Sequence, residues 1–100
     1  MPDARRLEAS EIQQRLAETP DWQLRSEQLV GEFRFANFVE AFGFMTSVAL
    51  IAEQMHHHPD WTNVFNTVSI RLSTHDVGGI STKDFALATA ISEVYRRFAG

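Results

Sequence analysis

A long apolar segment between Asn37 and Pro59 constrains the fold of this chain more than any other feature of its sequence. Asn37 and Glu40 have the spacing of an N-cap and its third helical residue, and Pro59 cannot continue a helix, so we expect a helix from about residue 38 to His57. Its apolar residues form two adjacent rows, at positions 38, 42, 45, 49 and 52 and at positions 41, 44, 48, 51 and 55. A face this wide must be covered by the rest of the fold or contribute to a subunit interface.

Alternation of apolar and polar residues predicts strands on both sides of this helix. Before the helix, residues 22–24 and 29–35 alternate with a period of two, which predicts two strands joined by a turn near Ser26-Glu27. After it, the same period predicts a strand over about residues 63–73, bent near Asn66. We expect a loop from His75 to Gly79.

Two further helices are predicted from their capping residues. Ser10 and Gln13 have the spacing of a capping box, and Thr19-Pro20 ends the helix that follows, because the residue before proline avoids the helical region. Ser81 and Asp84 have the same spacing and predict the start of a last helix. The residues that this last helix should bury are Leu87, Ile91, Val94 and Phe98.

Counting the two parts of the bent strand separately, the order of elements is α-β-β-α-β-β-α. We therefore expect an α+β fold, in which an antiparallel four-stranded sheet carries the helices on one face. A chain of 100 residues is expected to form a single domain over residues 1–100.

Composition excludes several functional classes. A net charge of −4 argues against a nucleic-acid-binding surface, which would need clustered Lys and Arg. The absence of cysteine excludes disulfides and thiolate metal sites. The first residues lack an apolar signal region, and Glu40 and Glu53 interrupt the longest apolar run, so we expect a cytoplasmic protein without a membrane span.

The four histidines are concentrated after the apolar helix. On the last helical turn, His56 and His57 should lie on the same side as Glu53, whereas His58 should leave the helix because it precedes Pro59. If the strand that precedes His75 ends near this turn, all four imidazoles border one pocket, and Glu53 and Asp84 are the carboxylates best placed to reach it.

Three interpretations of this cluster are open from the residues alone. It can be a solvated helix end, where histidine interacts favourably with the helix dipole. A metal site is disfavoured, because His57 and His58 cannot both bind a metal from one helix face and no His-x-x-x-His spacing occurs. The third interpretation is general acid–base catalysis, since imidazole exchanges protons near neutral pH and a neighbouring carboxylate orients the ring.

A longer motif resembles the pterin-4a-carbinolamine dehydratase family. The matching residues are Glu53, His57, His58, Pro59, Trp61, Asn63, Val64, Phe65, Asn66, Ser73, Thr74, His75 and Asp84. The resemblance implies dehydration of 4a-hydroxytetrahydrobiopterin to quinonoid dihydropterin and water, which recycles the pterin used by aromatic amino acid hydroxylases. It implies no metal and no organic cofactor.

The resemblance also implies roles for individual residues. The catalytic set would be His57, His58 and His75, with Asp84 orienting a histidine. The substrate-binding set would be Glu53, His56 and the backbone around Ser73 and Thr74, and Trp61 is a candidate pocket wall or core residue. The sequence does not assign which imidazole is the acid and which is the base.

The resemblance leaves a second functional class open. Some members of this family act as interaction proteins, either as a dimerisation cofactor for a transcription factor or as an assembly factor for an enzyme, and others are associated with molybdopterin. Because this chain keeps the three motif histidines and Asp84, the enzyme is favoured. The family further implies a homodimer or homotetramer, which agrees with the wide apolar face of the long helix.

Overall fold

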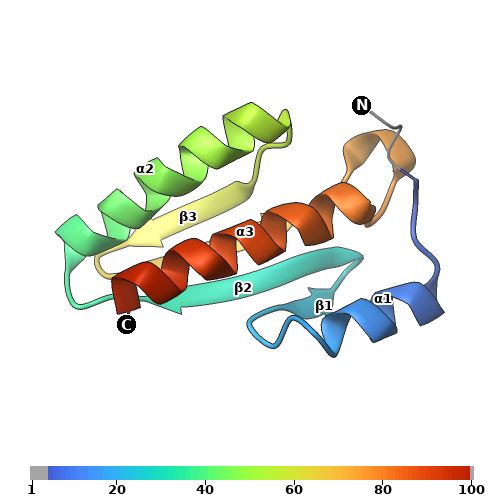
Figure 1. Ribbon diagram of the computed structural model, residues 1–100, viewed down its shortest axis with the longest axis horizontal. Coiled ribbons are helices and arrows are strands. Elements are labelled where there is room, and N and C mark those ends of the chain that lie inside the picture. The colour runs from blue at the N-terminus through green and yellow to red at the C-terminus, as the bar shows by residue number, and fades with distance from the viewer. Residues whose placement is uncertain (1–4, 100) are drawn as a thin grey trace.

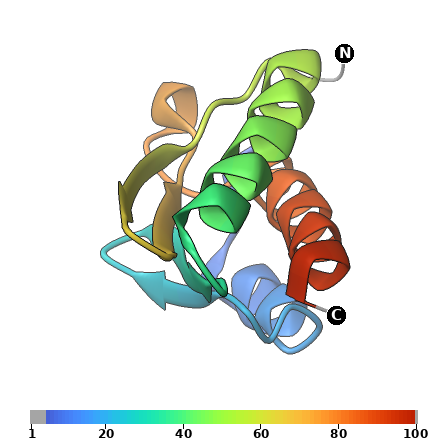
Figure 2. The same cartoon turned by 90° about the vertical axis from the view of Figure 1, so that its left-hand side faces the viewer.

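One layer of the molecule is a four-stranded antiparallel sheet, and the other is formed by two long helices that lie side by side across it (Figures 1 and 2). The computed structural model describes residues 5–99. The strands, in spatial order, are β1 (Gln23–Arg25), β2 (Gln28–Arg34), β4 (Thr67–Leu72) and β3 (Asp60–Val64). The helices are α1 (Ala9–Leu16), α2 (Phe38–Met55), α3 (Thr82–Ala99) and the short 3₁₀ helix η1 (His75–Val77). The predicted order of elements and the α+β class are confirmed.

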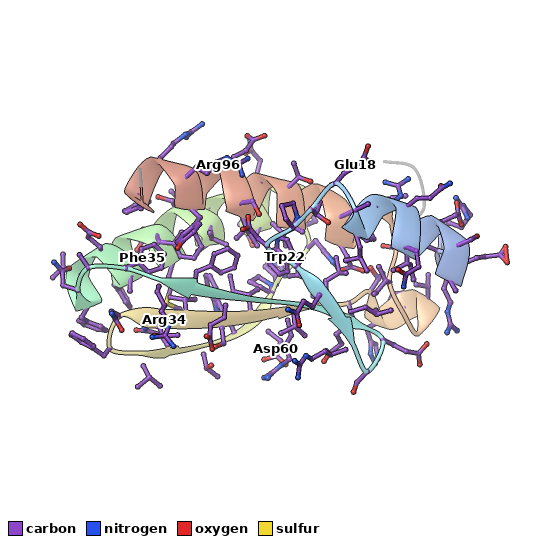
Figure 3. The ribbon with its side chains drawn as sticks, turned by 90° about the horizontal axis from the view of Figure 1, so that it is seen from below. Glu18, Trp22, Arg34, Phe35, Asp60 and Arg96 are labelled. Carbon is purple, nitrogen blue, oxygen red and sulfur yellow. The ribbon has the colours of Figure 1, made fainter. Side chains whose placement is uncertain are left out.

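The core lies between the sheet and the two long helices. Phe33 of β2 and Phe44 of α2 are almost fully buried, with ring centroids 5.5 Å apart, and Phe35 lies 4.8 Å from Phe44. Trp22 donates its indole N–H to the buried Ser92 of α3 at 3.0 Å. Figure 3 shows Trp22 and Phe35 between the two layers. The aromatic residues therefore hold both helices to the same face of the sheet, as the period-two pattern predicts.

The two apolar rows of α2 have different environments. In one row, Ala41, Phe44 and Val48 are fully buried against the sheet and α3, and the last two residues of the row are half-buried. The other row leaves Phe38 and Phe42 about half exposed, at 49% and 55%. Our expectation of a covered face thus holds for one row only, and the second row faces outward.

By length and composition alone, α2 would be long enough and apolar enough to cross a membrane. This differs from our expectation that Glu40 and Glu53 exclude a span. The buried row packs against β4 and α3 in the same way as a core helix, and we interpret α2 as a core helix with one exposed apolar face.

The predicted start of the first helix was wrong. The first helix begins after Glu8 and not at Ser10, because Glu11 accepts a hydrogen bond from the Glu8 N–H at 3.1 Å. Arg5 contacts the same carboxylate through two nitrogens at 2.9 and 3.0 Å, and this hydrogen-bonded pair lowers the pKa of Glu11 to about 2. Ser10 lies within the helix.

The predicted strand over residues 63–73 is a hairpin. Asp60 already starts β3, and the chain reverses at Phe65, whose φ of 50° is left-handed. The side chain of Asn63 donates to the carbonyls of Phe65 and Thr67, and that of Asn66 donates to the carbonyl of Phe35. These amides supply the hydrogen bonds that turn the predicted bend into a full reversal.

Candidate active site

The C-terminal end of α2, the helix η1 and the start of α3 meet at one end of the molecule (Figure 1). An open depression of about 350 Å³ lies between them. Its lining consists of His56, His57, His58, Ser73, Thr74, His75, Asp76 and Lys83. The fold thus brings all four histidines to one depression, as predicted from the sequence.

The end of α2 differs from the prediction in a way that decides where the histidines point. The helix ends at Met55 and not at His57, because His56 adopts a left-handed conformation with φ of 55°. The His56 N–H bonds to the Glu53 carbonyl and the His57 N–H to the Ala52 carbonyl, both at 3.1 Å, which is the hydrogen-bond pattern of a Schellman motif. This reversal occurs before Pro59 and takes His57 off the helix face that carries Glu53.

His57 pairs with Asp84 instead of Glu53. Its Nε2 lies 2.6 Å from Oδ1 of Asp84, and the two side chains are only 10% and 0% exposed. Asp84 is in the first turn of α3, where its Oδ2 accepts the Ser81 N–H at 2.9 Å. The predicted cap of the last helix is therefore confirmed, and the capping carboxylate also holds the imidazole of His57.

Two buried hydroxyl groups complete the surroundings of Asp84. Thr74 donates its hydroxyl to Oδ2 of Asp84 at 2.8 Å, and the Thr74 and Ser81 hydroxyl oxygens lie 2.6 Å apart. Because a hydroxyl group has one proton and Thr74 donates it to Asp84, Ser81 must donate to Thr74. The hydroxyl chain thus runs one way, from Ser81 through Thr74 to Oδ2, and leaves Oδ1 for His57.

Thr74 is held by backbone bonds as well. Its N–H donates to the Gly79 carbonyl at 2.8 Å, so both its N–H and its hydroxyl are used within the protein. We predicted a substrate-binding role for the backbone around Ser73 and Thr74, and that role stays a prediction. The structure places Thr74 where it supports Asp84.

His58 and Glu53 form a second, exposed pair. The Nε2–H of His58 donates to Oε1 of Glu53 at 2.8 Å, and the two side chains are 66% and 77% exposed. This hydrogen bond lowers the pKa of Glu53 below its usual value. We predicted Glu53 beside both His56 and His57. This was wrong for His57, because the Schellman motif redirects the chain after His56, whereas His56 is near enough to contribute to the lowered pKa of Glu53.

His75 begins η1 at the edge of the depression and is exposed. Within residues 5–99 its imidazole has no hydrogen bond or ion pair with another side chain. No group of three or more His, Cys, Asp or Glu residues in the described part of the chain is arranged to bind a metal ion. The cluster therefore offers one imidazole held rigidly by a buried carboxylate and three at its exposed rim.

Comparison with known proteins agrees with this geometry. The family model for pterin 4 alpha carbinolamine dehydratase matches residues 5–94. The chain belongs to this family. A protein of Prochlorococcus marinus strain SARG, provisionally named pterin-4-alpha-carbinolamine dehydratase, is 50% identical over 88 residues, which are 88% of this chain and 92% of that protein. A protein of strain MIT 9313 with the same provisional name is 52% identical and covers 86% of this chain and 90% of its own.

Two solved structures have the same fold. A crystal structure of a transcriptional coactivator/pterin dehydratase from Brucella melitensis superposes with a TM-score of 0.89 at 35% identity, covering 91% of this chain and 99% of that one. A pterin dehydratase-like protein described as a RuBisCO assembly factor in the alpha-carboxysome gives a TM-score of 0.62 at 20% identity, over 74% of this chain and 86% of that one. The second likeness shows the fold alone.

Some residues of the motif that carries the resemblance have structural roles in this chain. Asn63 and Asn66 hold the β3–β4 turn, and Trp61 packs against the hydrophobic core and is not part of the lining of the depression. Sequence analysis did not assign Ser81 or Lys83 to the site. The capping spacing of Ser81 and Asp84 was a usable signal for Ser81, because residues three apart lie on one side of a helical turn.

Proposed function

We propose that this protein dehydrates a 4a-hydroxytetrahydropterin to a quinonoid dihydropterin and water, using histidines as general acid and base. The observation that carries the proposal is the buried contact of 2.6 Å between His57 and Asp84, at a depression that His58 and His75 also line. Membership of a family named for a carbinolamine dehydratase supports the pterin substrate. A cytoplasmic location beside an aromatic amino acid hydroxylase, which would supply the substrate, is part of the same proposal.

The reaction needs two proton transfers. The C4a–O bond breaks and the hydroxyl leaves as water, so an acid must protonate this oxygen. The N5–H proton goes to a base, and the electron pair of that bond forms the C4a=N5 double bond. The reaction neither oxidises nor reduces the pterin overall. Each well-positioned proton transfer typically contributes a factor of about 10²–10⁴ in rate, or roughly 3–5 kcal/mol.

His57 fits the role of the base. Because Asp84 accepts the Nε2–H, the Nδ1 of His57 is the nitrogen that can take a proton, and the carboxylate stabilises the imidazolium that results. The exposed His58 and His75 fit proton delivery to the leaving hydroxyl, since solvent can reprotonate them between turnovers.

A direct assay tests the proposal. A 4a-hydroxytetrahydropterin is generated immediately before mixing, and formation of the quinonoid product is followed spectroscopically with and without protein. We expect His57→Ala, His58→Ala and His75→Ala each to lower turnover, and His56→Ala to act mainly on substrate binding. A wild-type rate equal to the buffer rate would contradict the proposed activity, and wild-type turnover in all three variants would contradict the histidine mechanism.

We further propose that the exposed row of α2 forms a homodimer or homotetramer interface. The row includes Phe38 and Phe42, and the neighbouring Val39 and Leu50 are 77% and 70% exposed. Phe44 and Val48 are fully buried in the monomer and are not available to a partner. Phe42→Glu should therefore give a folded monomer in sedimentation, and Thr62→Glu, an exposed position on β3 outside this face, is the charge control. A monomeric wild-type protein at micromolar concentration would rule out this interface.

An interaction protein without activity is the second candidate function. The exposed apolar row of α2 favours it, together with the likeness to the Brucella melitensis structure described as a transcriptional coactivator/pterin dehydratase. The assay above separates the two candidates, because a protein that acts only by binding leaves the dehydration rate at its buffer value.

A further inference from the structure

A second depression of about 280 Å³ adjoins the candidate active site. The two depressions share Ser73, Thr74 and His75 as a common wall. The other wall of the second depression is formed by the β1–β2 turn, residues 26–28, and by Gly78 and Gly79. The turn lies at the same end of the molecule as η1 and the start of α3 (Figure 1).

The β1–β2 turn has an unusual backbone for the residues it contains. Ser26 and Glu27 have φ values of 50° and 61°, so two consecutive residues other than glycine are left-handed. Two-residue hairpin turns with this geometry favour Asn-Gly or Gly-Gly, and an ordinary side chain in the left-handed region costs about 1–2 kcal/mol. Glycine would form this turn more easily. Ser26 and Glu27 instead place a hydroxyl group and a carboxylate on the wall of the depression.

The carboxylate of Glu27 also contacts a distant part of the chain. Arg6 contacts Oε1 of Glu27 through a guanidinium nitrogen at 2.6 Å, and the backbone of Arg6 forms an antiparallel bridge with Ser81. Because these two side chains are 55% and 69% exposed, the pair contributes little to the position of Glu27. The left-handed β1–β2 turn is what places this carboxylate on the wall of the second depression.

The chemistry of a pterin connects the two depressions. The hydroxyl group leaves C4a and the proton leaves N5, and N5 is bonded directly to C6, the ring atom that carries the side chain of natural pterins. His75 is the one proposed catalytic histidine that borders both depressions. With this edge of the ring turned toward His75, a side chain on C6 would reach the second depression, which His75 also borders.

We propose that the second depression binds a hydroxylated C6 side chain of the pterin, with Glu27 accepting hydrogen bonds from its hydroxyl groups. Ser26 and Gln28 supply further polar groups on the same wall. This inference rests on the proposed function and adds a preference for a neutral polyol side chain over a small alkyl one. A carboxylate accepts from two neighbouring hydroxyls, whereas an alkyl substituent leaves that carboxylate without a ligand partner.

Equilibrium binding of two stable dihydropterins tests this preference. One is 7,8-dihydrobiopterin, which carries a dihydroxypropyl group on C6, and the other is 6-methyl-7,8-dihydropterin, which has no side-chain hydroxyl. Dissociation constants are measured by pterin fluorescence for the wild type, Glu27→Gln and Glu27→Gly. We expect the wild type to bind the hydroxylated ligand about tenfold tighter, the size of one hydrogen bond to a charged group. Both variants should bring the ratio of the two constants close to one by weakening only the hydroxylated ligand.

The variants and controls separate a lost contact from a damaged turn. Glu27→Gly removes the carboxylate while favouring the left-handed turn, so its fold should survive, as circular dichroism can check. Glu18→Gln makes the same chemical change at an exposed carboxylate outside the second depression (Figure 3) and should leave both constants unchanged. Arg6→Gln removes the ion pair but keeps the carboxylate, so it should retain most of the preference.

Four outcomes would overturn the inference. Equal binding of both pterins by the wild type, or equal weakening of both by Glu27→Gly, removes the subsite while the proposed function stands. If Glu27→Gly still prefers the hydroxylated pterin as the wild type does, another part of the protein is responsible for the selectivity. If neither pterin binds the wild type, the proposed function fails first and the subsite fails with it.

Discussion

His57 and His58 are neighbours in the chain and each contacts a carboxylate, yet the two pairs have opposite environments. The His57–Asp84 contact is 2.6 Å long between side chains that are 10% and 0% exposed. The His58–Glu53 contact is 2.8 Å long between side chains that are 66% and 77% exposed. Distance and residue type are almost the same, and burial is the difference.

The comparison shows that burial determines how strongly such a pair influences the protein. In water the attraction between an imidazolium and a carboxylate is weak and is screened further by salt. A buried pair interacts more strongly, and the loss of one partner leaves the other desolvated without compensation. Asp84 has a further function that Glu53 lacks, because it also caps α3 and accepts the Thr74 hydroxyl.

The largest effect should come from neutralising the buried carboxylate. In Asp84→Asn the amide can still accept from Ser81 and Thr74, but its NH₂ group would face Nε2 of His57 and favour a proton on Nδ1. If His57 is the base, turnover should fall by about 10²–10⁴ with most of the stability retained. The same change in the exposed pair, Glu53→Gln, is the matched control. Equal losses in the two variants would show that burial does not distinguish them.

The next largest effect should be on stability. His57→Ala leaves Oδ1 of the buried Asp84 without its partner, which should lower the free energy of unfolding by about 1–3 kcal/mol in urea denaturation. We expect no measurable change for His58→Ala, because both members of that pair remain hydrated. If His58→Ala proves the more destabilising of the two, the comparison is reversed.

A smaller effect should come from His56, which separates the two pairs. Because His56 has φ of 55°, His56→Gly should stabilise the protein by about 0.5–1 kcal/mol while keeping His57 and His58 in place. Gln54→Gly, an exposed residue in the last turn of α2, should change stability in the opposite direction by about the same amount. Thermal denaturation compares the two. Destabilisation by His56→Gly would show that its side chain is needed at the helix end.

The smallest effect should be visible only in the titration of Glu53. The hydrogen bond from His58 lowers the pKa of Glu53, so this pair favours the folded state above the usual glutamate pKa, and the contribution is lost as the pH falls through the lowered folded pKa. In His58→Ala, NMR titration should show the Glu53 pKa rising toward its usual value of 4.5. High salt should produce a rise in the same direction in the wild type. A Glu53 pKa that stays low in the variant would indicate another partner.

Most of the fold could be predicted from the sequence because local patterns specify it. Each of these patterns involves residues that are close together in the chain. They are the period-two segments, which predict the strands, and the Asn37 and Ser81–Asp84 caps, which predict the two long helices. The boundaries that were wrong depend on interactions that these patterns do not show. The first helix begins after Glu8 because a cap between Glu8 and Glu11, which Arg5 supports, forms in place of the one expected at Ser10. The β3–β4 reversal is held by a bond from Asn66 to Phe35, the residue that follows β2.

The candidate site shows the same division. From the sequence alone we could predict that the four histidines and Asp84 lie near one another, since the histidine run follows one long helix and the Asp84 cap begins the other. Which carboxylate pairs with His57 and which with His58 depends on the tertiary structure. A left-handed residue at His56 turns the chain by an amount that spacing does not encode, and burial of Asp84 beneath Thr74 and Ser81 arises when β4, η1 and α3 pack together. Spacing specifies neighbours along one element, whereas the dielectric environment of a charge depends on every element packed around it.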